Sequence, residues 1–191
     1  MRILISEDQK LIGAALEKGL KEEGYAVDWM DNLTDGLHLA KEIEYDTVIL
    51  DIMLPDGSGL DVLTNIRGLY IHTPVLVLSA KDALADKVAA FRLGTDDYMT
   101  KPFEFEELLL RVGALIRRKY QVYGHQIEYQ NLKLDLSARV AKIDGEILKL
   151  TSKEYAVLEL FLLKRTKILS RYKIAEHIYP ESGDQGSNVI D

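Results

Sequence analysis

The sequence contains no cysteine, which excludes a disulfide framework and any thiolate metal site. It has no apolar run near the roughly 20 residues of a membrane span, and its first residues, MRILISED, do not resemble a signal peptide. We therefore expect no membrane contact and a cytoplasmic location. An excess of positive charge is also missing, since the net charge is −7. This balance argues against strong nucleic-acid binding by the chain as it stands.

The charge is distributed unevenly along the 191 residues. Residues 1–119 contain 14 Lys and Arg against 21 Asp and Glu, whereas residues 120–191 contain 10 of each. This difference indicates two domains, and the length is sufficient for both. The boundaries that we expect are 1–118 for the first domain, 119–126 for a linker and 127–191 for the second domain.

Short apolar runs alternate with amphipathic stretches through the first domain. Five strands alternating with five helices predict an α/β fold, with a parallel sheet that is covered on both faces. The expected strands are 2–6, 25–29, 47–51, 73–79 and 97–100, and the expected helices are 11–20, 34–42, 59–67, 84–93 and 104–118.

The second domain has a different pattern of apolar and polar residues. Residues 127–150 alternate in short segments typical of small antiparallel strands, with Asp144-Gly145 as a hairpin signal. The run from Thr151 to Glu154 is typical of a capping box that opens a helix, and 171–178 predicts a second helix. Ser187 is the expected N-cap of a third. The four histidines are scattered without metal-ligand spacing, so we expect each to be structural or exposed.

Polar side chains follow the expected strands of the first domain where ligands bind to parallel sheets, at their carboxyl ends. They are Glu7, Asp8, Asp51, Ser79 and Lys101. Three converging carboxylates repel one another and favour a hard cation such as Mg²⁺. Asp51 could then act as a nucleophile that forms an aspartyl phosphate, with a hydroxyl and an ammonium group contacting the phosphate. Taken singly, each residue is more often a cap, a turn former or a solvated charge, so the prediction depends on the ordered set.

That set resembles the response-regulator receiver domain of bacterial two-component signalling, over residues 1–118. The residues that carry the resemblance are Glu7-Asp8, Asp51 within LDIMLPDGSGL, Ser79-Ala80, Asp96-Asp97-Tyr98 and Lys101-Pro102-Phe103. It implies a flavodoxin-like, doubly wound five-stranded sheet. It also implies that Asp51 accepts phosphate from a sensor histidine kinase.

The resemblance implies roles for the neighbouring residues as well. Mg²⁺ would be held by Glu7, Asp8, Asp51 and the backbone carbonyl of Met53. The phosphoryl group would contact Ser79 and Lys101, and Tyr98 would turn inward as a switch when Ser79 moves. Lys101-Pro102 would be a cis peptide. Serine at position 79, where threonine is frequent, keeps the hydroxyl and should preserve the chemistry.

The second half resembles the winged-helix DNA-binding domain of OmpR/PhoB-type regulators. The segments that carry this resemblance are LTSKEYAVLELF, ILSRYKIAEHIY and SNVID, of which the last looks like the start of a recognition helix at Ser187 and Asn188. By comparison with that family the recognition helix is cut short and the wing is absent, so we expect this chain to be defective in DNA binding. We also expect the apolar faces bearing Leu158, Leu162, Ile174 and Ile178 to be exposed, which would make this half marginally stable or require a partner chain to cover it.

The resemblance further implies a homodimer through the face formed by the fourth helix, the fifth strand and the fifth helix. Lys87 would pair with Glu107, and Asp97 with Arg111, across a two-fold axis. On the residues alone these are ordinary surface charges, worth at most about 1 kcal/mol each. The residues expected at this face are Lys87, Val88, Asp96, Asp97, Glu107, Leu108, Arg111 and Arg118.

Three functions compete. The first is a phosphorylation-controlled transcription factor that is not an enzyme, with a histidine kinase and DNA as partners. The second is a receiver-type regulator that acts through protein contacts alone. The third is a Mg²⁺-dependent phosphohydrolase, which commonly needs a second aspartate two residues after the nucleophile, where this sequence has Met53.

Overall fold

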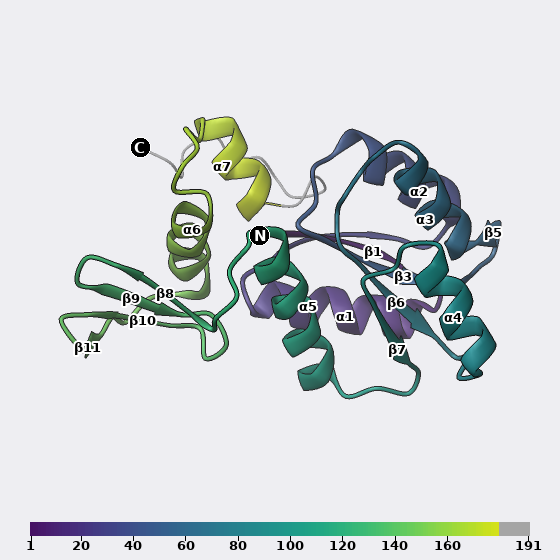
Figure 1. Ribbon diagram of the computed structural model, residues 1–191, viewed down its shortest axis with the longest axis horizontal. Helices are drawn as coiled ribbons and strands as arrows, with labels where there is room; N and C mark the ends of the chain where they lie inside the picture. The colour runs from purple at the N-terminus through teal and green to yellow at the C-terminus, as the bar shows by residue number, and fades with distance from the viewer. Residues whose placement is uncertain (180–191) are drawn as a thin grey trace.

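The computed structural model describes residues 1–179. A five-stranded parallel sheet forms the first half of the chain, with strand order β2-β1-β3-β6-β7 (Figure 1). Its strands are β1 (Arg2–Ser6), β2 (Ala26–Met30), β3 (Thr47–Asp51), β6 (Val75–Ser79) and β7 (Asp97–Thr100). The helices between them are α1 (Lys10–Glu22), α2 (Leu33–Glu42), α3 (Gly59–Gly68), α4 (Leu84–Arg92) and α5 (Phe105–Lys119). The doubly wound α/β prediction is therefore confirmed.

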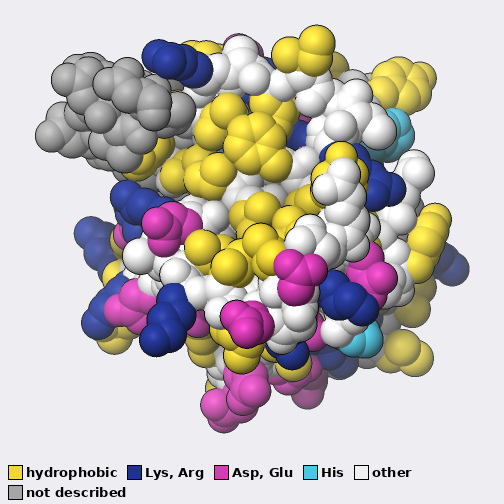
Figure 2. Space-filling view, turned by 90° about the vertical axis from the view of Figure 1, so that its left-hand side faces the viewer, with side chains coloured by type: hydrophobic (Ala, Val, Ile, Leu, Met, Phe, Trp, Pro, Cys, Tyr) yellow, Lys and Arg dark blue, Asp and Glu magenta, His cyan; other side chains and the backbone are white. Residues whose placement is uncertain are grey.

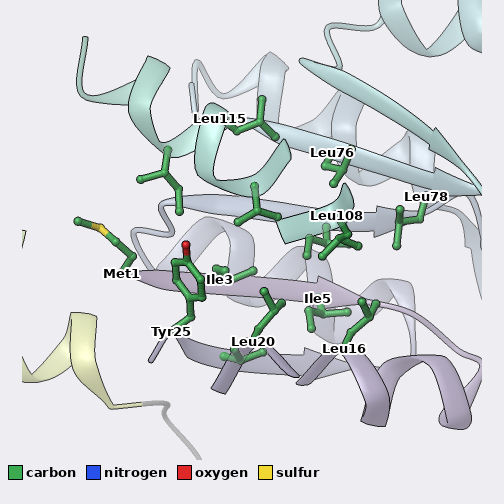
Figure 3. Close-up of a cluster of buried hydrophobic side chains, with 14 of the residues drawn as sticks. Met1, Ile3, Ile5, Leu16, Leu20, Tyr25, Leu76, Leu78, Leu108 and Leu115 are labelled. Carbon is green, nitrogen blue, oxygen red and sulfur yellow. The ribbon is translucent and has the colours of Figure 1, made fainter. Parts of the chain in front are cut away.

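Both faces of this sheet are buried, as the continuous apolar runs in its strands predict. On one face α1 and α5 pack against alternate residues of the strands, including Ile3, Ile5 and Leu76 (Figure 3). On the other face α2, α3 and α4 cover the remaining residues, among them Leu4 and Val77. The two cores fix the sheet, so the carboxyl ends of β1, β3 and β7 form a stable edge.

The structure contains one element that the sequence did not predict. Between β3 and α3 the chain forms a short antiparallel hairpin of β4 (Met53–Leu54) and β5 (Gly57–Ser58). Asp56 at its turn accepts hydrogen bonds from the backbone N–H groups of Leu33 and Thr34 at the start of α2. The hairpin thereby connects the segment after Asp51 to the beginning of α2.

The second half begins with a four-stranded antiparallel sheet. Its strands are β8 (Gln126–Tyr129), β9 (Leu132–Asp135), β10 (Val140–Ile143) and β11 (Glu146–Ile147). Asp144 and Gly145 both have positive φ between β10 and β11, as the hairpin signal predicts. Two helices follow, α6 (Ser152–Leu163) and α7 (Arg171–Ile178), and the capping box of Thr151 and Glu154 is present at the start of α6.

Helix α6 is apolar on nearly all sides, which is typical of a helix covered by more than one partner. Leu160 is fully buried in the same cluster as the core on the α1–α5 side, whereas Phe161 lines a shallow hollow of about 250 Å³ with Tyr129 and Leu158. Figure 2 shows hydrophobic side chains gathered on this side of the molecule.

The expectation of exposed apolar faces on α6 and α7 is wrong for the residues that the structure describes. Leu162 and Ile178 are buried, and Leu158 and Ile174 are partly buried. Ile174 packs against the core of the first half of the same chain. Leu158 and Leu162 instead pack with the antiparallel sheet of the second half, so the described residues of this chain provide cover that we expected to be missing or to come from a partner chain. Within residues 1–179 no helix combines the length and the apolar character needed to span a bilayer.

Candidate functional site

Three carboxylates meet at the carboxyl edge of the parallel sheet. Glu7 and Asp8 directly follow β1, and Asp51 is the last residue of β3. Each offers one oxygen, and these oxygens lie within 4.8 Å of one another. Glu7 and Asp51 are buried, and Asp8 is partly buried. A set of oxygen ligands without histidine or cysteine suits a hard divalent cation, so the residues fit Mg²⁺.

A single ammonium group connects two of these carboxylates. Lys101, just after β7, places its Nζ 2.6 Å from Oε2 of Glu7 and 2.6 Å from Oδ2 of Asp51. Its backbone N–H donates to the carbonyl of Ser79, and the Lys101-Pro102 peptide is cis, as the resemblance implies. One positive charge therefore faces three carboxylates, and the edge keeps a net negative charge that favours a cation.

The pKa of Glu7 reflects this environment. Burial raises it above its ordinary value, and the nearby charge of Asp51 adds to the increase. The hydrogen bond and charge of Lys101 act in the opposite direction without cancelling the effect. An added divalent cation would stabilise the ionised form of Glu7 in the same way as Lys101 does.

The backbone around Asp51 fixes the direction of its side chain. Oδ1 accepts the backbone N–H of Met53 at 2.9 Å, so both carboxylate oxygens of Asp51 have a donor. The first residue of α3, Gly59, packs directly against the backbone of Asp51, and a Cβ there would lie 1.8 Å from the Asp51 carbonyl oxygen. Position 59 therefore requires glycine because of this close approach.

Ser79 and Tyr98 meet at the same backbone segment. The Oγ of Ser79 accepts the N–H of Lys81 at 3.0 Å, and the hydroxyl of Tyr98 donates to the carbonyl of Lys81 at 2.7 Å. Tyr98 is 9% exposed and lies in the core on the α2–α4 side. Lys81, which sequence reasoning missed, is thus the backbone link between the two residues expected to act as a switch.

Trp29 is a second residue that sequence reasoning missed. Its indole Nε1–H donates to the backbone carbonyl of Glu7 at 2.8 Å, and its ring lies against Gly13 of α1. It therefore ties the end of β2 to the turn that carries Glu7 and Asp8. No sequence pattern marks it, because an aromatic residue in a strand is ordinarily a packing residue.

We expect Trp29→Phe to weaken Mg²⁺ binding by about fivefold, since the lost hydrogen bond is worth roughly 1 kcal/mol and the Glu7 turn becomes less restricted. Calorimetric titration with Mg²⁺ measures the change. Tyr25→Phe is the control, because Tyr25 precedes the opposite end of β2 and its hydroxyl contacts Arg139 of the second half rather than the turn of Glu7. Equal affinities in the wild type and Trp29→Phe would show that Trp29 only packs.

The residues expected at a dimer face occupy α4, β7 and α5, and several already pair within one chain. Arg111 contacts Asp97 at 2.9 Å and Glu107 at 2.7 Å, while Asp96 pairs with Arg67 of α3 at 2.9 Å. The remaining expected residues are Lys87 and Val88 on α4 and Arg118 on α5. Arg111 must therefore release Asp97 of its own chain before it can pair with Asp97 of a second copy across a two-fold axis.

Leu108 does not belong to that face. It is fully buried, together with Val112 and Leu115, in the core between α5 and the sheet. Its spacing of four and seven residues from these two places it on the inner stripe of α5. The expected DNA-binding residues Ser187 and Asn188 lie outside the described residues.

Comparisons with known proteins agree with this geometry. The family model described as response regulator receiver domain matches residues 3–113, and the model described as transcriptional regulatory protein, C terminal, matches residues 145–191. The transcriptional activator protein IrlR of Burkholderia pseudomallei is 41% identical over the whole chain, which covers 83% of that protein. The transcriptional regulatory protein CusR of Escherichia coli is 42% identical over the whole chain, which covers 85% of it.

Solved structures show the same fold. The receiver domain of Francisella response regulator 1452 matches with a TM-score of 0.60 and 33% identity, covering 62% of this chain and 98% of that one. Response regulator DrrB, an OmpR/PhoB homologue from Thermotoga maritima, matches with a TM-score of 0.56 and 28% identity, covering 93% of this chain and 79% of that one. The receiver domain of Pseudomonas aeruginosa kinase PA1611, described with magnesium in its active-site cleft, matches with a TM-score of 0.56 and 26% identity over 60% of this chain and 96% of that one.

Proposed function

Because this chain belongs to the OmpR/PhoB-type response regulators, which control transcription in response to phosphorylation, we propose that Asp51 is the side chain that accepts the phosphoryl group. The single observation that supports this choice is its position. Asp51 is the buried carboxylate at the end of β3 that contacts Lys101 and also offers an oxygen to the acidic cluster.

The proposed transfer uses one oxygen of Asp51 as the nucleophile. A bond forms between that oxygen and phosphorus, while the bond from phosphorus to the imidazole nitrogen of a kinase phosphohistidine breaks. Mg²⁺, when bound, neutralises charge on the phosphoryl oxygens. Glu7, Asp8, Asp51 and the carbonyl of Met53 are the groups we propose to hold it.

The other residues of the edge have roles that follow from their contacts. Lys101 already donates to Asp51 and can move its ammonium group to a phosphoryl oxygen. Ser79 can exchange its contact with the Lys81 N–H for one in which its hydroxyl donates to the phosphate. Since Tyr98 holds the carbonyl of Lys81, a movement of Ser79 is transmitted to Tyr98 and the α4–β7–α5 face. We propose this face as the two-fold dimer contact.

The partners that we propose are a sensor histidine kinase and DNA, the latter through the second half. The relatives described above are transcriptional regulators, which favours this function over a phosphohydrolase and over regulation by protein contacts alone. The position two residues after Asp51 is Met53, which cannot act as a general acid.

Intact mass after incubation with a small acyl phosphate tests the proposed chemistry. We expect the gain of one phosphoryl group in the presence of Mg²⁺ and almost none when the metal is removed with a chelator, since three carboxylates would otherwise repel the phosphate. Circular dichroism controls for the fold. No gain with Mg²⁺ in a folded sample would show that the acidic cluster serves another purpose.

A further inference from the structure

The second half of the chain packs on the amino edge of the parallel sheet, opposite the three carboxylates (Figure 1). The chain's first residue lies between the two halves, and its amino group donates to the carbonyl of His177 in α7 at 3.0 Å. Leu160 of α6 is fully buried in the core of the first half, and Leu163 and Ile174 pack against that core. Part of the contact between the halves is therefore apolar and continuous with the main core.

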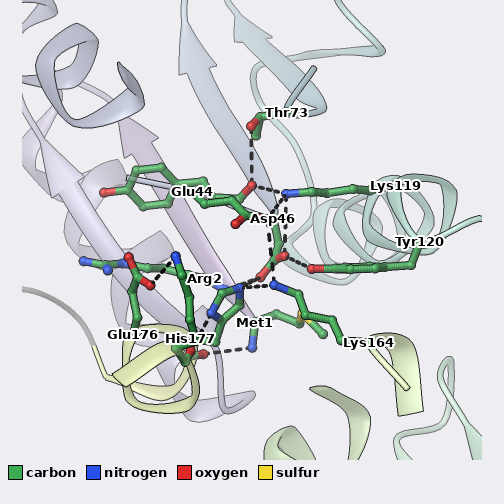
Figure 4. A network of polar contacts seen from close by, with 12 residues as sticks. Met1, Arg2, Glu44, Asp46, Thr73, Lys119, Tyr120, Lys164, Glu176 and His177 are labelled. Carbon is green, nitrogen blue, oxygen red and sulfur yellow. Dashed lines mark hydrogen bonds and ion pairs between the residues drawn. The ribbon is translucent and has the colours of Figure 1, made fainter. Parts of the chain in front are cut away.

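A buried carboxylate lies at the centre of this contact. Asp46, directly before β3, is fully buried and accepts hydrogen bonds from the backbone N–H of Arg2 and the hydroxyl of Tyr120 (Figure 4). Lys119 places its Nζ 3.7 Å from Oδ1 of Asp46, and His177 places its Nε2 3.9 Å from Oδ2. Although burial opposes ionisation, the charges of Lys119 and of the chain's amino group, together with the hydrogen bond from Tyr120, hold the pKa of Asp46 below its ordinary value.

The second half contributes a buried Lys–His pair to this cluster. Nζ of Lys164 lies 2.7 Å from Nε2 of His177, and Nδ1 of His177 lies 2.9 Å from the carbonyl of Lys173. Since a carbonyl only accepts, Nδ1 carries the hydrogen and Nε2 offers its lone pair to the ammonium group. The arrangement requires a neutral imidazole, and burial lowers the pKa of His177 accordingly.

A second anchor joins the halves at the α1 side. The guanidinium group of Arg139 lies over the ring of Tyr155 at 4.4 Å and the ring of Tyr25 at 5.1 Å, so it bridges an aromatic ring from each half. Ser152, at the start of α6, donates to the carbonyl of Glu22 at 3.2 Å. The two halves thus have a defined orientation, set at two separate places.

We propose that the amino edge of the receiver sheet is a docking surface for α6 and α7 of the same chain, and that Asp46, Lys164 and His177 form a latch which protonation of His177 opens. A proton on Nε2 would point at the Lys164 ammonium group and place two positive charges 2.7 Å apart. Lys164 also pairs with Glu44 of the first half at 3.8 Å, so its displacement breaks an ion pair across the contact. The attraction between the new imidazolium and Asp46 acts over the longer distance of 3.9 Å and is the weaker of the two effects. The charged and titratable groups around this imidazole are Asp46, the amino group of Met1, Lys164, Lys173, Glu176, Lys119, Tyr120 and Glu44.

The direction of the pH effect follows from the two groups. The docked form favours neutral His177 and ionised Asp46, so both lose their contribution as the pH falls. For His177 the contribution is complete above its ordinary pKa of 6.5 and is lost as the pH falls below that value. Asp46 acts in the same direction at lower pH. Acid therefore opens the contact, and the docked form dominates at neutral pH.

Tryptic cleavage after Lys119 tests the latch, because Lys119 lies at the end of α5 with its side chain held against Asp46. We expect Lys164→Ala to be cut at least tenfold faster than the wild type at pH 7.5, with a larger radius of gyration by small-angle scattering. Lys142→Ala, at an exposed lysine of β10, is the matched control and should behave as the wild type. Equal cleavage of the wild type and Lys164→Ala would overturn the docking proposal.

The pH dependence is tested with His177→Gln, whose amide oxygen can accept a hydrogen bond from Lys164 but does not titrate. The radius of gyration of the wild type should increase when the pH falls from 7.5 to 5.5, and that of His177→Gln should not. Expansion of both proteins at the same pH would assign the effect to other groups and overturn the role of His177. Two further measurements report on the distant end of the sheet. A change in the fluorescence of Trp29 would identify unfolding of the receiver. Loss of phosphorylation of Asp51 by an acyl phosphate, with the fluorescence of Trp29 unchanged, would identify a failure of the phosphorylation proposal instead.

Discussion

We expect an Asp51→Asn variant to gain no phosphoryl group when it is incubated with Mg²⁺ and a small acyl phosphate, and the wild type to gain one. Asparagine has nearly the same shape, can still accept the N–H of Met53 and can still contact Lys101, but its amide oxygen is not a nucleophile of comparable strength. The expected effect is therefore complete loss of phosphorylation in a folded protein. Intact mass spectrometry and thermal unfolding measure the two properties on the same sample.

Asp61→Asn is the matched control for this variant. Asp61 lies on the surface of the first turn of α3, two residues beyond the glycine that packs against Asp51. Its substitution removes the same charge close to the site and should leave the mass gain unchanged. Phosphorylation of Asp51→Asn at the wild-type level would place the acceptor elsewhere in the chain, and peptide mapping would then locate it.

The second large effect is expected from Gly59→Ala. The added methyl group would lie 1.8 Å from the carbonyl oxygen of Asp51, and it would meet backbone atoms rather than a side chain that can rotate away. Either α3 or the end of β3 must move, at a cost of about 3 kcal/mol or more. We expect a large decrease in the free energy of unfolding and weaker phosphorylation, because the displaced strand end carries Asp51.

Gly68→Ala, at the other end of the same helix, provides the comparison. A Cβ at Gly68 would meet no heavy atom within 4 Å, and alanine has the higher helix propensity. Its free energy of unfolding should equal or exceed that of the wild type by about 0.5–1 kcal/mol. Chemical denaturation of both variants measures the contrast, and similar values for Gly59→Ala and Gly68→Ala would mean that the contact at Asp51 relaxes easily.

The sequence was sufficient to predict the parallel sheet because its strands are buried on both faces and therefore appear as continuous apolar runs. The same topology brings Glu7, Asp8 and Asp51 together, since the carboxyl ends of parallel strands share one edge. The β4–β5 hairpin was not predictable in this way, because strands of two residues have no periodicity. Leu108 was assigned to the wrong side of α5 although its spacing from Val112 and Leu115 contained the information.

Contacts between distant parts of the chain were beyond sequence reasoning. Trp29 donates to a backbone carbonyl, which any residue can offer, so no side-chain pattern marks the pair. Asp46 precedes a strand and resembles an ordinary turn residue, and His177, expected to be structural or exposed, is fully buried. Their meeting depends on how the two halves pack, for which neither local periodicity nor charge gives a signal.

The short strand β3 has an acidic residue at each end, and this has a consequence for how the protein tolerates variation. Asp51 lies five positions after Asp46 along an extended chain, or about 16 Å away, a distance at which the energetic effects of two substitutions ordinarily add. Sequence change at the interdomain contact can therefore accumulate with little effect on the chemistry of the acidic edge. The chemistry can be preserved across relatives while the arrangement of their two halves diverges.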